Sequence, residues 1–130
     1  MPNKPRVLLA DDHESVLDGT RTILEPEFDV VGAVSDGEAL IRAAENLKPD
    51  VMVVDVEMPV MGGIEAAKRL KKLYPEAKIV FMSVYGAPAI IQEALSTGAL
   101  GYVLKVSADD DLVEAVREAL QGRSFISPAL

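Results

Sequence analysis

The sequence predicts an α/β fold, in which a parallel β-sheet is covered by helices on both of its faces. Five short apolar runs alternate with five segments in which apolar residues recur at helical spacing. The runs lack polar alternation, which is typical of strands buried on both faces of a parallel sheet. Because the connections are short, right-handed crossovers place the strands in one sheet. A chain of 130 residues is long enough for one domain with its own core.

The expected elements follow one another at a regular spacing. Strands are expected at residues 6–10, 28–34, 51–55, 78–82 and 100–104. Apolar residues at helical spacing predict helices through residues 16–24, 40–47, 64–73, 91–95 and 112–120.

Turn residues mark the ends of the elements in the first half of the chain. The first helix begins near His13, which we assign no catalytic role, and it ends at Pro26. The turn at Asp36 begins the second helix with an acidic first turn, and that helix stops before Pro49. The third strand has four consecutive apolar residues and stops at Asp55, where a proline and a glycine pair require a loop.

The second half of the chain shows the same kind of boundaries. Gly62 and its neighbour open the third helix, which Pro75 ends. Pro88 suits the first turn of the fourth helix, and Gly98 is its expected C-terminal stop. The last helix ends before Gly122. The tail that follows is apolar enough to pack, but no element is predicted in it.

Composition excludes several classes of function. The absence of Cys excludes disulfides, thiolate metal sites and Cys nucleophiles, and it is compatible with a cytoplasmic protein. A net charge of −8 disfavours direct binding to nucleic acid, which needs clustered Lys and Arg. No apolar run approaches the roughly 18 residues of a membrane span, and we expect neither a signal peptide nor a membrane partner.

Charged and hydroxyl side chains follow four of the five expected strands. Asp11 and Asp12 come after the first strand, and the third, fourth and fifth lead to Asp55, Ser83 and Lys105. These side chains converge because parallel strands end at one edge of the sheet, where ligands bind in open α/β folds. Three close carboxylates need a cation, and an all-oxygen set suits a hard ion, Mg²⁺ before Zn²⁺.

The chemistry of this set fits phosphoryl transfer to a carboxylate. Asp55, on the expected central strand, is the candidate nucleophile and would form an aspartyl phosphate. Mg²⁺ held by Asp12 and Asp55, with Asp11 binding directly or through water, would neutralise charge on one side. Lys105 would neutralise charge on the other side, and the Ser83 hydroxyl would donate to a phosphoryl oxygen.

With Met58-Pro59 and Gly62-Gly63 after Asp55, and with the segment 101–105, these residues resemble the receiver domain of bacterial two-component response regulators. The resemblance covers essentially the whole chain. It implies a doubly wound, flavodoxin-like (βα)5 fold with a five-stranded parallel sheet of order 2-1-3-4-5. It also implies that Mg²⁺ is required and that the phosphohistidine of a histidine kinase is the phosphoryl donor.

The same resemblance assigns roles to residues around the site. The backbone carbonyl of Glu57 would be the third protein ligand of the metal. Tyr102 matches the aromatic that turns inward when Ser83 moves toward the phosphate, which changes the surface around the fourth helix, fifth strand and fifth helix. Glu57 and Tyr85 occupy positions that tune the lifetime of the aspartyl phosphate. Val106 stands where many receivers have Pro, so we expect a trans peptide bond before it.

The beginning Asp11-Asp12-His13 and the ending at 122–130 resemble receivers of the NarL/LuxR-type class, which are joined to a helix-turn-helix domain. We therefore expect a receiver domain at 1–122 and, at 123–130, the start of a linker to an output domain absent from this chain. Such a protein would regulate transcription, and phosphorylation could drive formation of a homodimer.

Two other functions compete with this interpretation. A haloacid-dehalogenase-like, Mg²⁺-dependent phosphatase also uses a strand-end Asp, but it has two Asp separated by one residue after the first strand, whereas here Asp11 and Asp12 are adjacent. A pseudo-receiver that only binds other proteins would not need the intact set of acids, Ser and Lys. A receiver is expected to be a signalling domain that catalyses its own phosphorylation and slow dephosphorylation, not an enzyme acting on a separate substrate.

Overall fold

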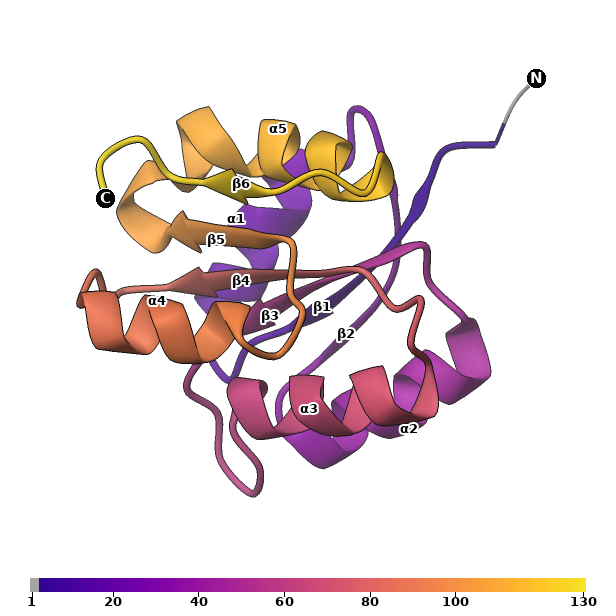
Figure 1. The fold of residues 1–130 in the computed structure, drawn as a ribbon. Coiled ribbons are helices and arrows are strands. Elements are labelled where there is room, and N and C mark those ends of the chain that lie inside the picture. Colours follow the sequence, from indigo (N-terminus) through magenta and orange to yellow (C-terminus); the bar gives the residue numbers. More distant parts are fainter. Residues whose placement is uncertain (1–2) are drawn as a thin grey trace.

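The computed structural model describes residues 3–130, which form a six-stranded parallel sheet with helices on both faces (Figure 1). The strands are β1 (Arg6–Ala10), β2 (Asp29–Val34), β3 (Val51–Asp55), β4 (Ile79–Ser83), β5 (Gly101–Leu104) and β6 (Phe125–Ile126). The α-helices are α1 (Glu14–Leu24), α2 (Gly37–Leu47), α3 (Gly63–Leu73), α4 (Pro88–Leu95) and α5 (Ala108–Leu120). A short 3₁₀ helix, Lys105–Ser107, connects β5 to α5.

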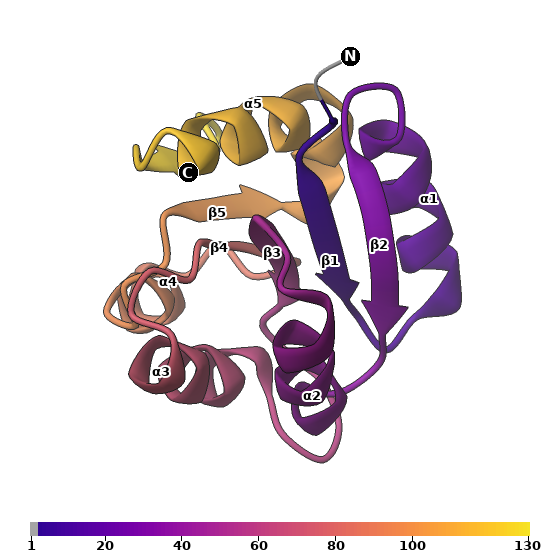
Figure 2. The same cartoon turned by 90° about the vertical axis from the view of Figure 1, so that its right-hand side faces the viewer.

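Two apolar layers hold the helices against the sheet. Helices α1 and α5 cover one face, to which they contribute Leu24 and Leu112. Helices α2, α3 and α4 cover the other face (Figure 2). There Leu40 is fully buried. Successive residues of β3 serve opposite layers, Val53 the first and Val54 the second. The continuous apolar run of β3 therefore reflects burial on both faces.

The predicted fold class and the order of the first five strands are confirmed. The sheet order is β2-β1-β3-β4-β5-β6, so the structure adds one strand beyond β5 to the expected five. In this added strand, Phe125 pairs with Gly101 and Ile126 pairs with Tyr102. Two paired residues are too few to produce a recognisable strand pattern in the sequence, and this is why no element was predicted there.

The tail is anchored beyond β6 by Ser127, which is buried. Its amide donates to the carbonyl of Tyr102 at 3.0 Å, and its hydroxyl accepts from the amide of Leu104 at 3.1 Å. Farther along, the Leu130 side chain reaches the loop between β4 and α4, where a Cβ added to Gly86 would lie 3.1 Å from it. The tail therefore contacts both β5 and the loop after β4.

The loop after β3 brings the backbone of Gly63 close to the backbone of Asp55, at the end of the strand. A Cβ at Gly63 would lie only 2.0 Å from the carbonyl oxygen of Asp55, so only glycine fits at this point. Within the loop, Val60 has a φ of 67°, a left-handed conformation that disfavours β-branched residues. The loop thus stores local strain next to a tightly packed glycine.

The backbone of residues 3–130 contains no cis peptide bond. The peptide bond before Val106 is therefore trans, as expected. In the same part of the chain, none of the helices has the length and apolar character needed to cross a membrane.

Candidate functional site

The carboxyl-terminal edge of the sheet brings the predicted side chains together. Asp11 follows β1, Asp55 is the last residue of β3, Ser83 is the last residue of β4, and Lys105 follows β5. Asp11, Asp55 and Ser83 are all buried. The sequence places them there because each strand is an apolar run that ends at a polar residue. The structure therefore places these residues at the edge where they were predicted to lie.

Lys105 lies between two of the buried carboxylates. Its Nζ is 2.8 Å from Oδ2 of Asp11 and 3.3 Å from Oδ2 of Asp55. Burial disfavours the ammonium, but the hydrogen bond to Asp11 and the charges of Asp55 and Asp11 outweigh it, so the pKa of Lys105 is raised. Lys105 is thus a fixed positive charge beside Asp55.

The negative charge of Asp55 is only partly compensated by the groups around it. Burial raises the pKa of the Asp55 carboxyl, and the nearby charge of Asp11 raises it further. Lys105 and the amide of Glu57, which donates to Asp55 Oδ1 at 3.3 Å, only partly oppose this increase. The ionised Asp55 therefore favours any additional positive charge that can approach it.

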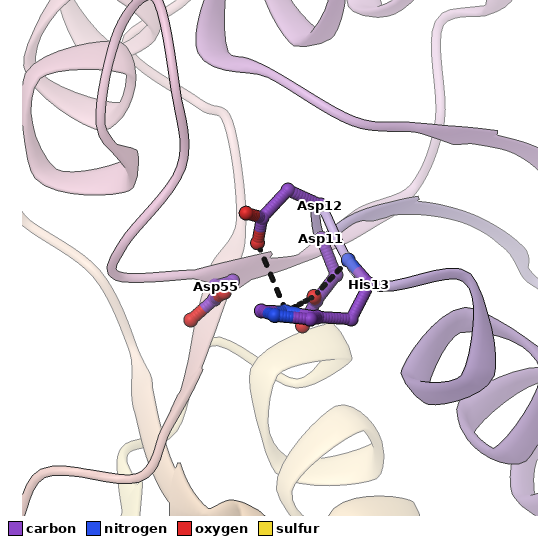
Figure 3. A group of neighbouring side chains, drawn as sticks. All are labelled: Asp11, Asp12, His13 and Asp55. Atoms are coloured by element: carbon purple, nitrogen blue, oxygen red, sulfur yellow. Dashed lines mark hydrogen bonds and ion pairs between the residues drawn. The ribbon is translucent and has the colours of Figure 1, made fainter.

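Asp11, Asp12, His13 and Asp55 gather in a cluster that can hold a cation (Figure 3). One ligand atom from each of the four lies within 4.8 Å of the others. Asp11 Oδ2 is buried, and its partner is the Lys105 ammonium at 2.8 Å. Three carboxylates that share one nearby ammonium match the ligands that Mg²⁺ prefers, so the residues fit this ion.

His13 is the member of this cluster to which sequence analysis assigned no role. Its Nδ1 lies 3.1 Å from Asp12 Oδ1 and 3.4 Å from Asp11 Oδ1 (Figure 3). The available signal was its position directly after the acid pair, at the residue that caps α1. A polar residue that begins a helix is common, so this position alone did not indicate a ligand.

Glu57 and Tyr85 both line a pocket of about 450 Å³, and the Tyr85 hydroxyl donates to the Glu57 carboxylate. That hydrogen bond and the charge of Glu57 raise the pKa of Tyr85. The other lining residues are Asp12, His13, Asp55, Met58, Pro59, Val84 and Lys105. The two residues predicted to tune the lifetime of the aspartyl phosphate therefore contact each other in the pocket that Asp55 also lines.

Tyr102 is fully buried in β5, and its hydroxyl donates to the backbone carbonyl of Tyr85 at 2.7 Å. Burial raises the pKa of the Tyr102 hydroxyl. The amide of Tyr85 in turn donates to the Ser83 hydroxyl at 3.0 Å. Tyr102 and Ser83 are thus linked through a single residue of the loop after β4. The sequence predicts a role for each of these three residues but carries no signal for this connection.

Comparison with known proteins shows one family. Residues 7–117 match the response regulator receiver domain. The chain is 38% identical over 128 residues to the transcriptional regulatory protein DegU of Brevibacillus brevis. This match covers 97% of this chain and 54% of DegU. It is 36% identical over 127 residues to the response regulator GacA of Pseudomonas aeruginosa, with 96% of this chain and 59% of that protein covered. The chain thus spans between half and two thirds of the length of these relatives.

Solved structures agree with the sequence comparison. A LuxR-family two-component response regulator from Aurantimonas sp. SI85-9A1 superposes with a TM-score of 0.93 at 33% identity, covering 98% of this chain and 92% of that one. The isolated receiver domain of RcsB from Salmonella enterica serovar Typhimurium, solved with the phosphomimetic BeF3−, gives a TM-score of 0.89 at 33% identity. That match covers 98% of this chain and 96% of the RcsB domain.

Proposed function

Since this chain belongs to the response regulator receiver domain family, of the NarL/LuxR-type class, we propose that it accepts a phosphoryl group onto Asp55 in a Mg²⁺-dependent reaction. One observation carries this proposal: Asp55 is buried at the end of β3, 3.3 Å from the Lys105 ammonium, in a cluster of carboxylates. The donor is the phosphohistidine of a histidine kinase. The Asp55 carboxylate forms a bond to phosphorus while the phosphorus–nitrogen bond breaks, and the imidazole leaves.

The metal would be held by Asp11, directly or through water, by Asp12 and Asp55, and by the backbone carbonyl of Glu57. When bound there, Mg²⁺ would neutralise negative charge on the phosphoryl oxygens. The raised pKa of Asp55, which Lys105 only partly opposes, supports a second positive charge at this site besides Lys105.

Ser83 and Lys105 would hold the transferred group. A hydroxyl has one donor and two acceptor positions, so Ser83 can accept from the Tyr85 amide and still donate to a phosphoryl oxygen. Lys105 already lies between the buried carboxylates, and its ammonium can transfer from Asp55 to the new phosphate at little cost.

Phosphorylation would be transmitted through the loop after β4. A phosphoryl group adds a charge of about −1.5 to −2 and three acceptor oxygens at neutral pH. Movement of Ser83 toward it would pull on Tyr85, and Tyr85 carries the carbonyl to which Tyr102 donates. The surface formed by α4, β5 and α5 would change as a result. This surface could then support a homodimer.

The hydrogen bond between Tyr85 and Glu57 supports a role in tuning the lifetime of the aspartyl phosphate. It holds the Glu57 carboxylate in the pocket that Asp55 lines, where the carboxylate would influence how water approaches Asp55. In this proposal the receiver catalyses its own phosphorylation and slow dephosphorylation, and it does not act as an enzyme on a separate substrate.

The relatives suggest what the domain controls. They are longer than this chain, and DegU is named a transcriptional regulatory protein. We propose a receiver domain at 1–122 and, at 123–130, a segment that pairs with β5 through Phe125 and Ile126 and begins the linker through which a helix-turn-helix domain is controlled in the cytoplasm. With a net charge of −8, the receiver itself would not bind DNA.

Phosphorylation by a small donor tests the proposal. The chain is incubated with Mg²⁺ and acetyl phosphate, and intact mass is measured. One acid-stable, base-labile phosphoryl adduct is expected, which should disappear in Asp55→Asn and in EDTA. Asp18→Asn, which removes an exposed carboxylate from α1, should keep the adduct. Steady turnover of phosphate esters would indicate the haloacid-dehalogenase-like phosphatase instead, and absence of any adduct would indicate the pseudo-receiver.

A further inference from the structure

We propose that His13 is a nitrogen ligand of the metal site and determines which ions the site accepts. This inference deepens the proposed Mg²⁺ site and rests on it. The four ligand atoms of the cluster include an imidazole nitrogen, and all lie within 4.8 Å of one another. Ligands on opposite sides of a divalent ion that binds oxygen or nitrogen at about 2.1 Å are about 4.2 Å apart, so only a small contraction is needed.

The side chain of His13 is not used to cap the helix that it begins. The residue caps α1, a position at which Ser, Thr, Asp or Asn usually accepts from the first helical amides. The His13 side chain makes no such hydrogen bond. Only its backbone is engaged there, since its amide donates to Asp11 Oδ1 at 2.9 Å and its carbonyl accepts from Val16 and Leu17.

The ring instead turns toward the acids (Figure 3). Nδ1 lies 3.1 Å from Asp12 Oδ1 and 3.4 Å from Asp11 Oδ1. The side chain is 66% exposed, so the ring can adjust without disturbing the core. With its proton on Nε2, the imidazole presents the Nδ1 lone pair to an ion held by the carboxylates.

An imidazole ligand changes the ion preference of the site. Three carboxylates alone suit Mg²⁺ and Mn²⁺, whereas imidazole favours later first-row ions such as Ni²⁺. His13 therefore adds affinity for Mn²⁺ and, more strongly, for Ni²⁺, and adds little for Mg²⁺. In cells with several divalent ions, this residue would set which of them occupies the site.

Pulsed electron paramagnetic resonance of bound Mn²⁺ tests the ligand directly. The protein must carry no affinity tag, because His13 is then the single imidazole in the chain. The wild type should show nitrogen hyperfine coupling from a coordinated imidazole, and His13→Asn should lose it. Asn suits the cap of α1, so this variant should melt no lower than the wild type. Oxygen-only coordination in the wild type, or coupling that persists in His13→Asn, would overturn the inference.

Affinities measured by calorimetry provide the second readout. His13→Asn should lower the affinity for Ni²⁺ by about tenfold or more and the affinity for Mg²⁺ by less than about twofold. An equal loss for both ions would contradict a specificity role. Asp12→Asn should weaken both ions, and Ni²⁺ affinity that survives this change would place the ion elsewhere and also refute the inference.

Failure of this inference can be separated from failure of the proposed function. The phosphoryl adduct of the wild type is measured in the same preparation. An adduct with oxygen-only metal coordination keeps the proposed function and removes the role of His13. Nitrogen coordination without any adduct keeps the ligand and removes phosphoryl transfer.

Discussion

Replacing Asp55 by Asn should stabilise the metal-free protein, although it removes the proposed phosphoacceptor. Asp55 is buried, and its ligand oxygen lies within 4.8 Å of one from Asp11, which gives a repulsion of about 3.5 kcal/mol at an effective dielectric constant of about 20. Attraction to the Lys105 ammonium at 3.3 Å stabilises the ionised Asp55 by about 5 kcal/mol at the same dielectric constant. Burial of the ion costs several kcal/mol more. The ionised Asp55 is therefore unfavourable by about 1–3 kcal/mol, in agreement with its raised pKa.

The pH dependence gives this prediction a sign that can be checked. A raised pKa means that the folded state binds the Asp55 proton more tightly than the unfolded state does. The stability that this proton provides is complete below the unfolded pKa of about 3.9 and is lost as the pH rises through the folded pKa. The advantage of Asp55→Asn should therefore be largest at neutral pH and shrink as the pH falls toward that unfolded value.

Calorimetry in EDTA at neutral pH is the assay, with Asp18→Asn as the matched control. A gain of 1 kcal/mol should raise Tm by about 3–5 °C for a domain of this size. Asp18→Asn makes the same change in net charge at an exposed position and should stay within about 0.5 kcal/mol of the wild type. Mg²⁺ at about 100 times its Kd should stabilise the wild type by about 2.7 kcal/mol, and Asp55→Asn by less. A variant that melts below the wild type in EDTA would show that the pair with Lys105 dominates and would refute the reasoning.

Three further predictions concern stability. Val60→Gly should stabilise by about 1 kcal/mol in urea unfolding, because it relieves the left-handed conformation at φ 67°, and an unchanged midpoint would show that the loop carries no strain. Tyr102→Phe should cost about 1 kcal/mol and speed amide exchange in the loop around Tyr85, whose carbonyl loses its donor; unaltered exchange would show that this bond does not order the loop. Gly63→Ala should cost more than about 3 kcal/mol, because its Cβ meets the end of β3 at 2.0 Å, whereas Gly19→Ala in the open middle of α1 should gain about 1 kcal/mol. Similar thermal melts for these two alanine variants would contradict the packing argument.

The sequence predicts most of the fold because its strands are buried on both faces. Burial of this kind leaves continuous apolar runs such as 51–54, and each run stops at the polar residue that the sheet brings to its edge. The same signal does not exist for β6. Phe125 and Ile126 lie between Ser residues and pair only because β5 has a free edge. Contacts with a distant strand, rather than local pattern, determine that element.

The site was predictable for residues that end strands and less so for those that meet across loops. Asp55, Ser83 and Lys105 follow from strand ends alone. The hydrogen bond of Tyr85 to Glu57 joins residues 28 positions apart, and it depends on how two loops close over the pocket. Similarly, the orientation of the His13 ring depends on acids held by the strands, which no local pattern records.

The short β6 also affects how two molecules can meet. An exposed sheet edge offers unpaired amides and carbonyls to a neighbouring chain and promotes aggregation. Here the edge of β5 is covered by the protein's own Phe125 and Ile126. A foreign strand would find only these two residues before Pro128, which has no amide hydrogen to donate. On this side of the molecule, the tail thus protects the protein against growth of the sheet from one copy to the next.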